Sequence, residues 1–411
     1  MAITDQEKGV WDIDQVYNKI NEGGIWEYNA PADPATFGWG TYLGVPLNDE
    51  IYRSSPTQIG GDAFSYISST SALNSLGTRS DGSLWAWGGT SMGRLGLNEG
   101  PGTYYSSPVQ IPGTTWSTAE NGVSASWANG AALKTDGTLW VMGANYRGSL
   151  GLNQPGATYY SSPTQIPGTT WSNIGGFVSD CGRAIKTDGT LWVWGRNDNA
   201  AQLPGALGLN DTINRSSPTQ LPGTWSQCMN IPTATYGIKT NGTLWSWGMN
   251  QGGQLGLNQG WPDGSGGYVR ISSPTQIGTN TDWSLLPKGT NAGNMCIAAI
   301  KTNNTLWVWG RNDNGQLGLN QGFPAYASSP IQLPGTNWSQ VRIRGSGMFA
   351  SKTDGTLWAW GDNASGSIGN NTGGSPTANE YSSPVQIPGT WVHSPLHGTG
   401  STAVFANVAG S

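Results

Sequence analysis

The chain has 411 residues and a formal net charge of −5, and only 10% of its residues are charged. A nucleic-acid binder should carry a basic face or tail. Residues 1–36 hold only two lysines, Lys8 and Lys19, so we expect no binding to nucleic acid. Glycine occurs 63 times and tryptophan 22 times, which indicates a tightly turned fold with an interior filled by aromatic side chains.

Residues 1–35 precede the repeats and are predicted to form an anchor segment. A short helix is expected over Asp12–Asn21, because Asp12 can cap it, Gln15 completes a capping box and Gly23-Gly24 end it. Its apolar stripe and two flanking tryptophans are candidates for docking on another protein; the alternative is that the helix packs on its own domain. These residues are Trp11, Ile13, Val16, Tyr17, Ile20 and Trp26.

The N-terminus lacks the apolar region of a signal peptide, and no apolar stretch is long enough to span a membrane. We therefore expect a protein made in the cytoplasm without export or membrane insertion. Cys181, Cys228 and Cys296 lie in different repeats, and their odd number excludes a complete disulfide framework. They are expected to be small buried residues of strands.

From residue 36 to residue 411 one pattern repeats, and it is clearest at Ile300–Gly335. Ile300–Thr302 and Thr305–Trp309 are predicted strands joined by a two-residue turn at Asn303-Asn304. In other copies this turn is Asp-Gly, so we expect positive φ at both turn residues. The first tryptophan of the returning strand recurs at Trp85, Trp140, Trp192, Trp245, Trp307 and Trp358.

Each copy continues through Leu-Gly-Leu-Asn or a relative of it, a variable loop and Ser-Ser-Pro. Each unit is expected to have four strands, the last beginning at this proline and lying at the outer edge of its sheet, where proline is tolerated. A period near 50 residues with such hairpins is typical of a propeller or a β-solenoid. The Ser-Ser-Pro segments begin at Ser54, Ser106, Ser161, Ser216, Ser272, Ser328 and Ser382.

The chain ends favour the propeller. The first copy, at Phe37–Gly40, lacks its opening strand, and Gly398–Gly410 looks like that missing strand without a hairpin after it. Pairing of Thr402–Asn407 with Trp39 would close a ring and remove exposed sheet edges. The predicted fold is therefore all-β: a seven-bladed β-propeller over residues 36–411, closed by its N- and C-terminal strands, with a short N-terminal helical anchor over residues 1–35.

The repeat resembles that of the regulator-of-chromosome-condensation family, most closely at Lys301–Leu319 and Lys239–Leu257. The resemblance implies a seven-bladed β-propeller. It does not imply the activity of the founding member, nucleotide exchange on a small GTPase beside chromatin, because fold and function are separable. Gly9-Val10-Trp11, followed by a helix and Gly-Gly-x-Trp, resembles the leading segment of virion proteins of tailed phages.

The variable loops are the candidate ligand-binding face, because they occupy the same place in every repeat and should emerge on one side of the ring. Their aromatic side chains suit sugars or protein partners, although a tyrosine beside Ser-Ser-Pro could simply cover its own blade. The candidates are Tyr104, Tyr105, Tyr159, Tyr160, Trp261, Tyr268, Phe323, Tyr326 and Tyr381.

The sequence shows no arrangement suited to catalysis. There is no Ser-His-Asp order and no carboxylate pair outside turns, and His393 and His397, the only histidines, flank Pro395. The recurring turn aspartates become asparagine at Asn241 and Asn303, which suits a turn and not a catalytic acid. We expect no catalytic residue, no metal and no cofactor. The aspartates are Asp81, Asp136, Asp188 and Asp354.

Three functions are considered. The leading hypothesis is a non-enzymatic virion protein of a tailed phage, displayed on a tail fibre or the capsid for host attachment or decoration. It would join other virion proteins through residues 1–35 and bind a host-surface glycan or protein. The alternative is a cellular adaptor or exchange-factor-like propeller that binds a protein partner. The third is a lyase or glycosidase built on a propeller.

Overall fold

The computed structural model describes residues 35–40, 53–58, 64–69, 74–154, 156, 158–178, 180–198, 205–259, 269–287, 295–320, 326–363, 368–370, 380–389, 391–396 and 403–408. The predicted anchor segment with its helix at Asp12–Asn21, and the loop residues Trp261, Tyr268 and Phe323, lie outside these residues.

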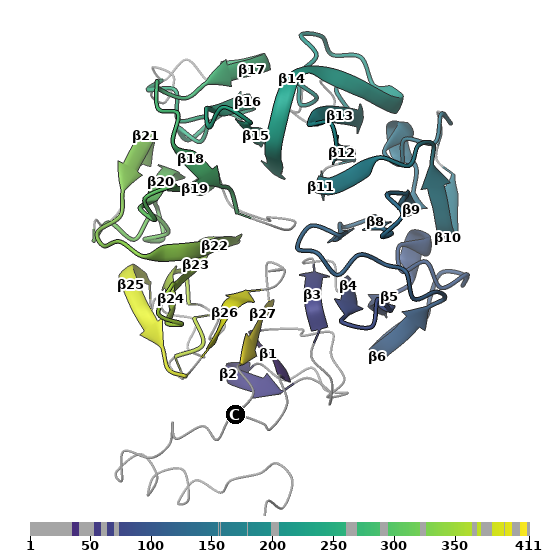
Figure 1. Ribbon diagram of the computed structural model, residues 1–411, viewed down its shortest axis with the longest axis horizontal. Coiled ribbons are helices and arrows are strands. Elements are labelled where there is room, and N and C mark those ends of the chain that lie inside the picture. The colour runs from purple at the N-terminus through teal and green to yellow at the C-terminus, as the bar shows by residue number, and fades with distance from the viewer. Residues whose placement is uncertain are drawn as a thin grey trace, which may run out of the picture.

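The described strands form antiparallel sheets arranged radially around a common centre, which is an all-β propeller (Figure 1). Chain order runs around the ring, and within each sheet a strand near the centre leads outward to a strand at the rim. Three four-stranded sheets are β2(Arg53–Gln58)-β1(Ala35–Gly40)-β27(Ala403–Val408)-β26(Trp391–Leu396), β3(Phe64–Ser69)-β4(Asn74–Arg79)-β5(Leu84–Gly89)-β6(Tyr104–Ile111) and β7(Val123–Ala125)-β8(Asn129–Leu133)-β9(Leu139–Ala144)-β10(Tyr159–Ile166).

One sheet has seven strands, because the long strand β14(Arg215–Ile231) is the outer strand of one unit and the inner strand of the next. It contains β11(Trp171–Val178), β12(Cys181–Lys186), β13(Thr190–Gly195), β14, β15(Ala234–Lys239), β16(Leu244–Asn250) and β17(Val269–Gln276). The last two sheets are β18(Trp283–Leu285)-β19(Cys296–Lys301)-β20(Leu306–Arg311)-β21(Tyr326–Gln332) and β22(Trp338–Arg344)-β23(Gly347–Lys352)-β24(Leu357–Gly361)-β25(Tyr381–Ile387). The helical segments of the described residues are two 3₁₀ turns, η1(Ser91–Gly93) and η2(Tyr146–Gly148).

The two ends of the chain meet in one sheet. β1 is hydrogen-bonded to β2 on one side and to β27 on the other, and Trp39 pairs with Val404. β27 in turn pairs with β26. The prediction that the C-terminal strand supplies what the first copy lacks is therefore confirmed.

The outer strands confirm one prediction and correct another. Pro108 lies in β6, which is at the edge of its sheet as predicted, but the strand begins four residues earlier, at Tyr104. Pairing with β5 skips from Tyr105 to Val109, because proline has no N–H to donate and the strand bulges around it.

The hairpin turns differ from the predicted two-residue type. Gly137 has positive φ (78°), but Asp136 does not. The Asp136 carboxylate accepts hydrogen bonds from the amide (3.0 Å) and hydroxyl (2.6 Å) of Thr138, which hold the aspartate in ordinary backbone geometry. Thr138 Oγ1 then accepts from Trp140 Nε1 (2.8 Å), so one turn residue orients the first tryptophan. The same relay recurs from Asp81, Asp188, Asn241, Asn303 and Asp354.

We expect Asp136→Asn to lower stability slightly at neutral pH and not at all in acid. The hydrogen bonds from Thr138 hold the pKa of the Asp136 carboxyl below its ordinary value. A depressed folded pKa adds stability above the unfolded pKa, and that stability is lost as pH falls through the folded pKa. Urea unfolding of both proteins between neutral pH and pH ~2.5 tests this, and a difference that persists in acid contradicts it. Asn241 and Asn303 show that asparagine keeps the turn.

The second tryptophan of each hairpin joins neighbouring units. Trp194 is fully buried and donates from Nε1 to the carbonyl oxygen of Ser149 (3.0 Å) in the preceding unit. Gly151 of Leu-Gly-Leu lies against the same indole, where a Cβ atom would stand 2.9 Å from it. Gly151 therefore has two roles: it adopts positive φ in its turn, and its missing side chain makes room for the indole of the next unit. We call a glycine that contacts the indole in this way a glycine seat. Trp247, Trp309 and Trp360 repeat the hydrogen bond.

Candidate functional site

The variable loops that the structure describes run between the third and fourth strands of their units. In an antiparallel meander the turn between the first two strands and the loop between the last two lie on the same side, here named the loop face. Tyr104, Tyr159 and Tyr326 are exposed there. Tyr105 and Tyr160 pack against the core, as does Tyr381, whose hydroxyl accepts from Asn370 Nδ2 (3.0 Å). For these three, the interpretation that a tyrosine covers its own unit fits the packing.

A side chain that sequence reasoning missed is connected to Tyr104 through Arg94. Trp127, in the turn between β7 and β8, is 58% exposed, and Tyr104 is 50% exposed. Arg94 links the two: its Nη1 donates to the carbonyl oxygen of Trp127 (2.9 Å), and its Nε donates to that of Gly89 (2.8 Å), which pairs with Tyr104 across β5 and β6. A tryptophan with no counterpart in the other repeats was the available signal.

The next unit extends this cluster. Tyr146 of η2 and Tyr159 share a hydrogen bond between their hydroxyls (2.9 Å), and their rings meet edge to face at 6.1 Å. The Tyr146 hydroxyl also reaches Met92 Sδ of η1 (3.9 Å). Because η1 leads directly into Arg94, the two groups of aromatic side chains belong to one surface.

An ion pair connects this surface to a third unit. Arg147 Nε lies 2.9 Å from Asp198 Oδ2. Asn214 Nδ2 donates to the same oxygen (3.1 Å), and its neighbour Ile213 is 63% exposed. We call this run of contacts the loop-face arc; it comprises Trp127, Arg94, Tyr104, Met92, Tyr146, Tyr159, Arg147, Asp198 and Ile213.

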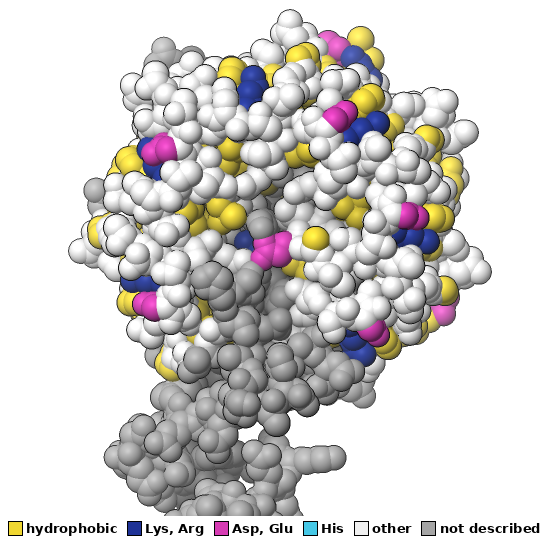
Figure 2. Space-filling model, viewed as in Figure 1, with side chains coloured by type: hydrophobic (Ala, Val, Ile, Leu, Met, Phe, Trp, Pro, Cys, Tyr) yellow, Lys and Arg dark blue, Asp and Glu magenta, His cyan; other side chains and the backbone are white. Residues whose placement is uncertain are grey.

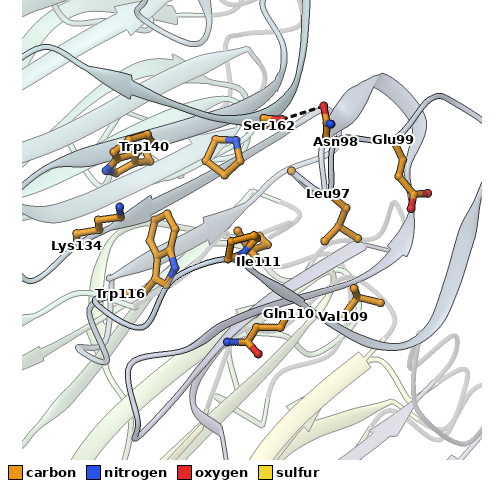
Figure 3. A pocket seen from close by; sticks show the side chains of 13 residues that line it. Leu97, Asn98, Glu99, Val109, Gln110, Ile111, Trp116, Lys134, Trp140 and Ser162 are labelled. Atoms are coloured by element: carbon orange, nitrogen blue, oxygen red, sulfur yellow. Dashed lines mark hydrogen bonds between the residues drawn. The ribbon is translucent and has the colours of Figure 1, made fainter.

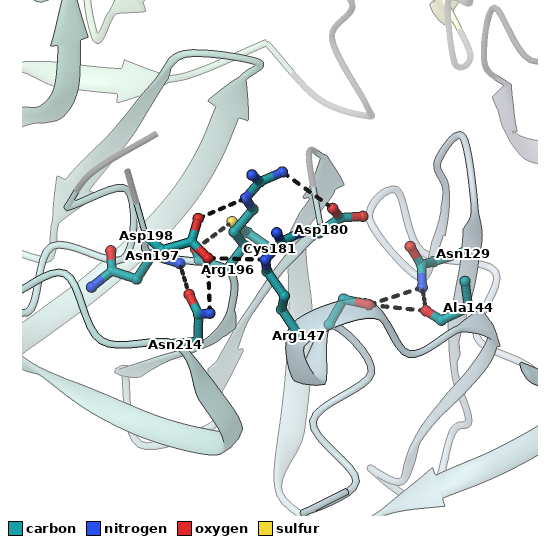
Figure 4. A network of polar contacts seen from close by, with 10 residues as sticks. Asn129, Ala144, Arg147, Asp180, Cys181, Arg196, Asn197, Asp198 and Asn214 are labelled. Carbon is teal, nitrogen blue, oxygen red and sulfur yellow. Dashed lines mark hydrogen bonds and ion pairs between the residues drawn. The ribbon is translucent and has the colours of Figure 1, made fainter. Parts of the chain in front are cut away.

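Beneath the arc lies a polar network that the sequence did not suggest (Figure 4). Arg196 lies between two carboxylates, 3.1 Å from Asp198 and 3.7 Å from Asp180. Burial raises the pKa of the Asp180 carboxyl, and Arg196 and Arg147 partly oppose the shift. Asp180 lies in the turn between β11 and β12, and Asp198 lies in a bend that follows β13. Both carboxylates face arginines, so the network ties two units together and offers no free acid or base.

The other reactive groups are also shielded. Cys181, Cys228 and Cys296 are buried, as predicted, and burial raises the pKa of the Cys228 thiol to about 12, so this thiol stays protonated. No cluster of three histidine, cysteine or acidic side chains suited to a metal occurs in the described part of the chain.

Charge is spread in small pairs. Figure 2 shows basic and acidic side chains beside one another at intervals around one face of the ring. One ion pair joins Lys301 Nζ to Asp282 Oδ1 at 3.1 Å. Within the described ranges, no helix is long and apolar enough to cross a membrane.

The comparisons with known proteins agree with this architecture. The model of the regulator of chromosome condensation (RCC1) repeat matches residues 303–343. The RCC1 domain-containing protein RUG3 of Arabidopsis thaliana is 25% identical over 315 residues, which are 70% of this chain and 68% of that protein. Residues 303–343 of the chain thus carry an RCC1 repeat.

Comparison with solved structures shows the same fold. Prp20p of Saccharomyces cerevisiae aligns over 92% of both chains with a TM-score of 0.71 at 18% identity. A shorter stretch, 130 residues, is 32% identical to the probable human ubiquitin ligase HERC6, but the chain spans only 12% of that protein. The matched residues 303–343 include the hairpin strand β20 and Gly318, which lies against Trp360, whereas Trp127 and Ile213 lie outside the match.

Proposed function

We propose that this chain is a non-enzymatic binding propeller that holds a protein partner on the loop-face arc. One observation carries the proposal: exposed Trp127, Tyr104, Tyr159 and Ile213 form one surface across three neighbouring units. Tryptophan, tyrosine and arginine dominate the energetics of protein interfaces, and a group of exposed apolar side chains marks an interaction site. The arc also offers Arg147 for polar contacts at its rim.

The relatives support a protein partner. The crystal structure of Prp20p was reported together with its binding to Gsp1p and histones. We further propose that the ring is a closed seven-bladed propeller, with the seven-stranded sheet counting as two blades and β1–β27 as the closure. A closed ring leaves few exposed edges, which gives the arc a rigid base.

Display on a phage particle is a second form of the proposal. It rests on the resemblance of Gly9–Trp26 to virion leader segments. We favour the cellular adaptor, because the relatives compared above are cellular proteins. Deletion of residues 1–35 should leave a folded propeller that no longer joins its particle. Incorporation of the truncated chain into particles would count against this form.

The arc is tested by affinity purification of the full chain from its native cell, with the recovered protein identified by mass spectrometry. We expect Trp127→Ala with Tyr104→Ala to reduce recovery of one specific protein at least about tenfold, because each anchor contributes about 1–2 kcal/mol. Ile331→Ala, an exposed residue of β21, is the matched control and should change nothing. Equal recovery with both variants would refute the arc as the binding surface.

A further inference from the structure

We propose a second kind of binding site, independent of the loop-face arc: grooves between neighbouring units that bind sugar rings of a neutral oligosaccharide. The first groove lies between β6 and β10 and has a volume of about 430 Å³. This volume lies within the range of small-molecule sites, about 300–1,000 Å³. Its walls combine indole rings with amide, hydroxyl and ammonium groups, which is the combination that a sugar needs.

The aromatic wall is held in a fixed geometry. Trp116 and Trp140 meet edge to face, with ring centroids 6.4 Å apart. Lys134 Nζ lies 4.9 Å and 4.3 Å from the two centroids, and Trp140 Nε1 is held by Thr138. Trp140 is partly exposed, so an indole surface is available in the groove. Aromatic faces pack against the C–H face of a sugar, and a preoriented ring loses little entropy on binding.

A buried hydrogen-bond donor points to a ligand. Trp116 is 2% exposed, and its Nε1 has no hydrogen-bond partner. Figure 3 shows this nitrogen turned toward Ile111, with Gln110 and Leu97 around the same space. Buried donors are normally paired, because an unpaired one costs about 1–3 kcal/mol. A sugar hydroxyl seated in the groove would accept from Trp116 Nε1.

The same construction recurs farther around the ring. A groove of about 330 Å³ is lined by Trp283, Trp307, Gln276, Asn258 and Pro330. Trp283 Nε1 is again buried without a partner, as is Nε1 of Trp171 and Trp338 at the same position of two other repeats. In contrast, Trp225, the tryptophan at the equivalent position of another repeat, donates from Nε1 to the carbonyl oxygen of Pro222 (3.3 Å).

Repetition favours a carbohydrate over a proline-rich peptide, the other ligand that indole grooves accept. Leu-Gly-Leu-Asn, the end of the outer strand, both tryptophans and the next Ser-Ser-Pro build each groove, so the repeat itself creates copies of one site. A surface that carries many copies of one sugar can occupy several such sites at once and gain avidity.

The test uses the full chain on an array of neutral oligosaccharides, with a proline-rich decapeptide as a second probe. We expect one class of sugar to bind, and the double variant Trp116→Phe/Trp283→Phe to weaken binding by about three- to tenfold per groove. Phenylalanine keeps the apolar wall and removes the donor. Trp225→Phe is the matched control, because its donor is already satisfied within the protein.

Thermal unfolding establishes that each variant is folded. Sugar binding that is weakened by the double variant and kept by Trp225→Phe supports the proposal. No binding of any neutral sugar, equal weakening by Trp225→Phe, or binding of the peptide in place of sugars overturns it. These outcomes are independent of the loop-face arc, because none of the variants changes Trp127 or Tyr104.

Discussion

A chain that ends before Ala403, and so lacks β27, should lose most of its stability and aggregate. β27 lies between β1 and β26, so its removal leaves β26 without a partner strand and one edge of β1 unpaired, and it would open the proposed closed ring. Unpaired edges template association with other chains. We expect a loss on the order of 5 kcal/mol or more, comparable with the whole stability of an ordinary domain. Urea unfolding and size-exclusion chromatography measure it.

A point variant separates strand pairing from chain length. Ala406 pairs with Phe37 on one side and Leu396 on the other, so its N–H faces a neighbouring strand. Ala406→Pro removes that donor from a central strand and should destabilise strongly, by about 3 kcal/mol or more, whereas Ala406→Ser keeps the backbone and should change little. A truncated chain or a proline variant with unchanged unfolding would show that the ring does not depend on this closure.

The second large effect is expected at the glycine after each tryptophan pair. Gly310 has φ of 97°, and a Cβ atom there would lie 2.2 Å from the carbonyl oxygen of Met295. Both the backbone conformation and the contact with backbone oppose a side chain, so Gly310→Ala should cost at least about 3 kcal/mol. Gly143, Gly195 and Gly361 meet the preceding turn in the same way.

Gly278→Ala is the matched control for this prediction. Gly278 also has positive φ (59°), but no atom lies within 4 Å of a Cβ added there. Gly278→Ala should lower the free energy of unfolding only by the penalty for positive φ, about 1–2 kcal/mol. Urea unfolding of both variants separates the two terms, and equal losses would mean that the contact with Met295 contributes nothing.

The features that could be predicted are those encoded within one repeat. Alternation of apolar residues, turn chemistry at Asp136-Gly137 and the tolerance of Pro108 at an edge identified the hairpins and the outer strand. The type of turn was predicted wrongly. Asp136 accepts a hydrogen bond from the amide of Thr138, and its φ is not positive. The pairing of β1 with β27 was predictable because the two chain ends carry complementary halves of one repeat.

The sequence by itself determined the repeat, its hairpins and the strand supplied by the C-terminus, because these depend on local spacing and on counting copies. Only the tertiary structure decided that Trp127, Arg94 and Tyr146 belong to one surface, and that Arg196 lies between Asp180 and Asp198. It also decided that Trp116 keeps an unpaired indole nitrogen in a groove. Such contacts depend on how one sheet packs on the next. The distance between neighbouring sheets is set by the buried tryptophans and the glycine seats, which act between repeats.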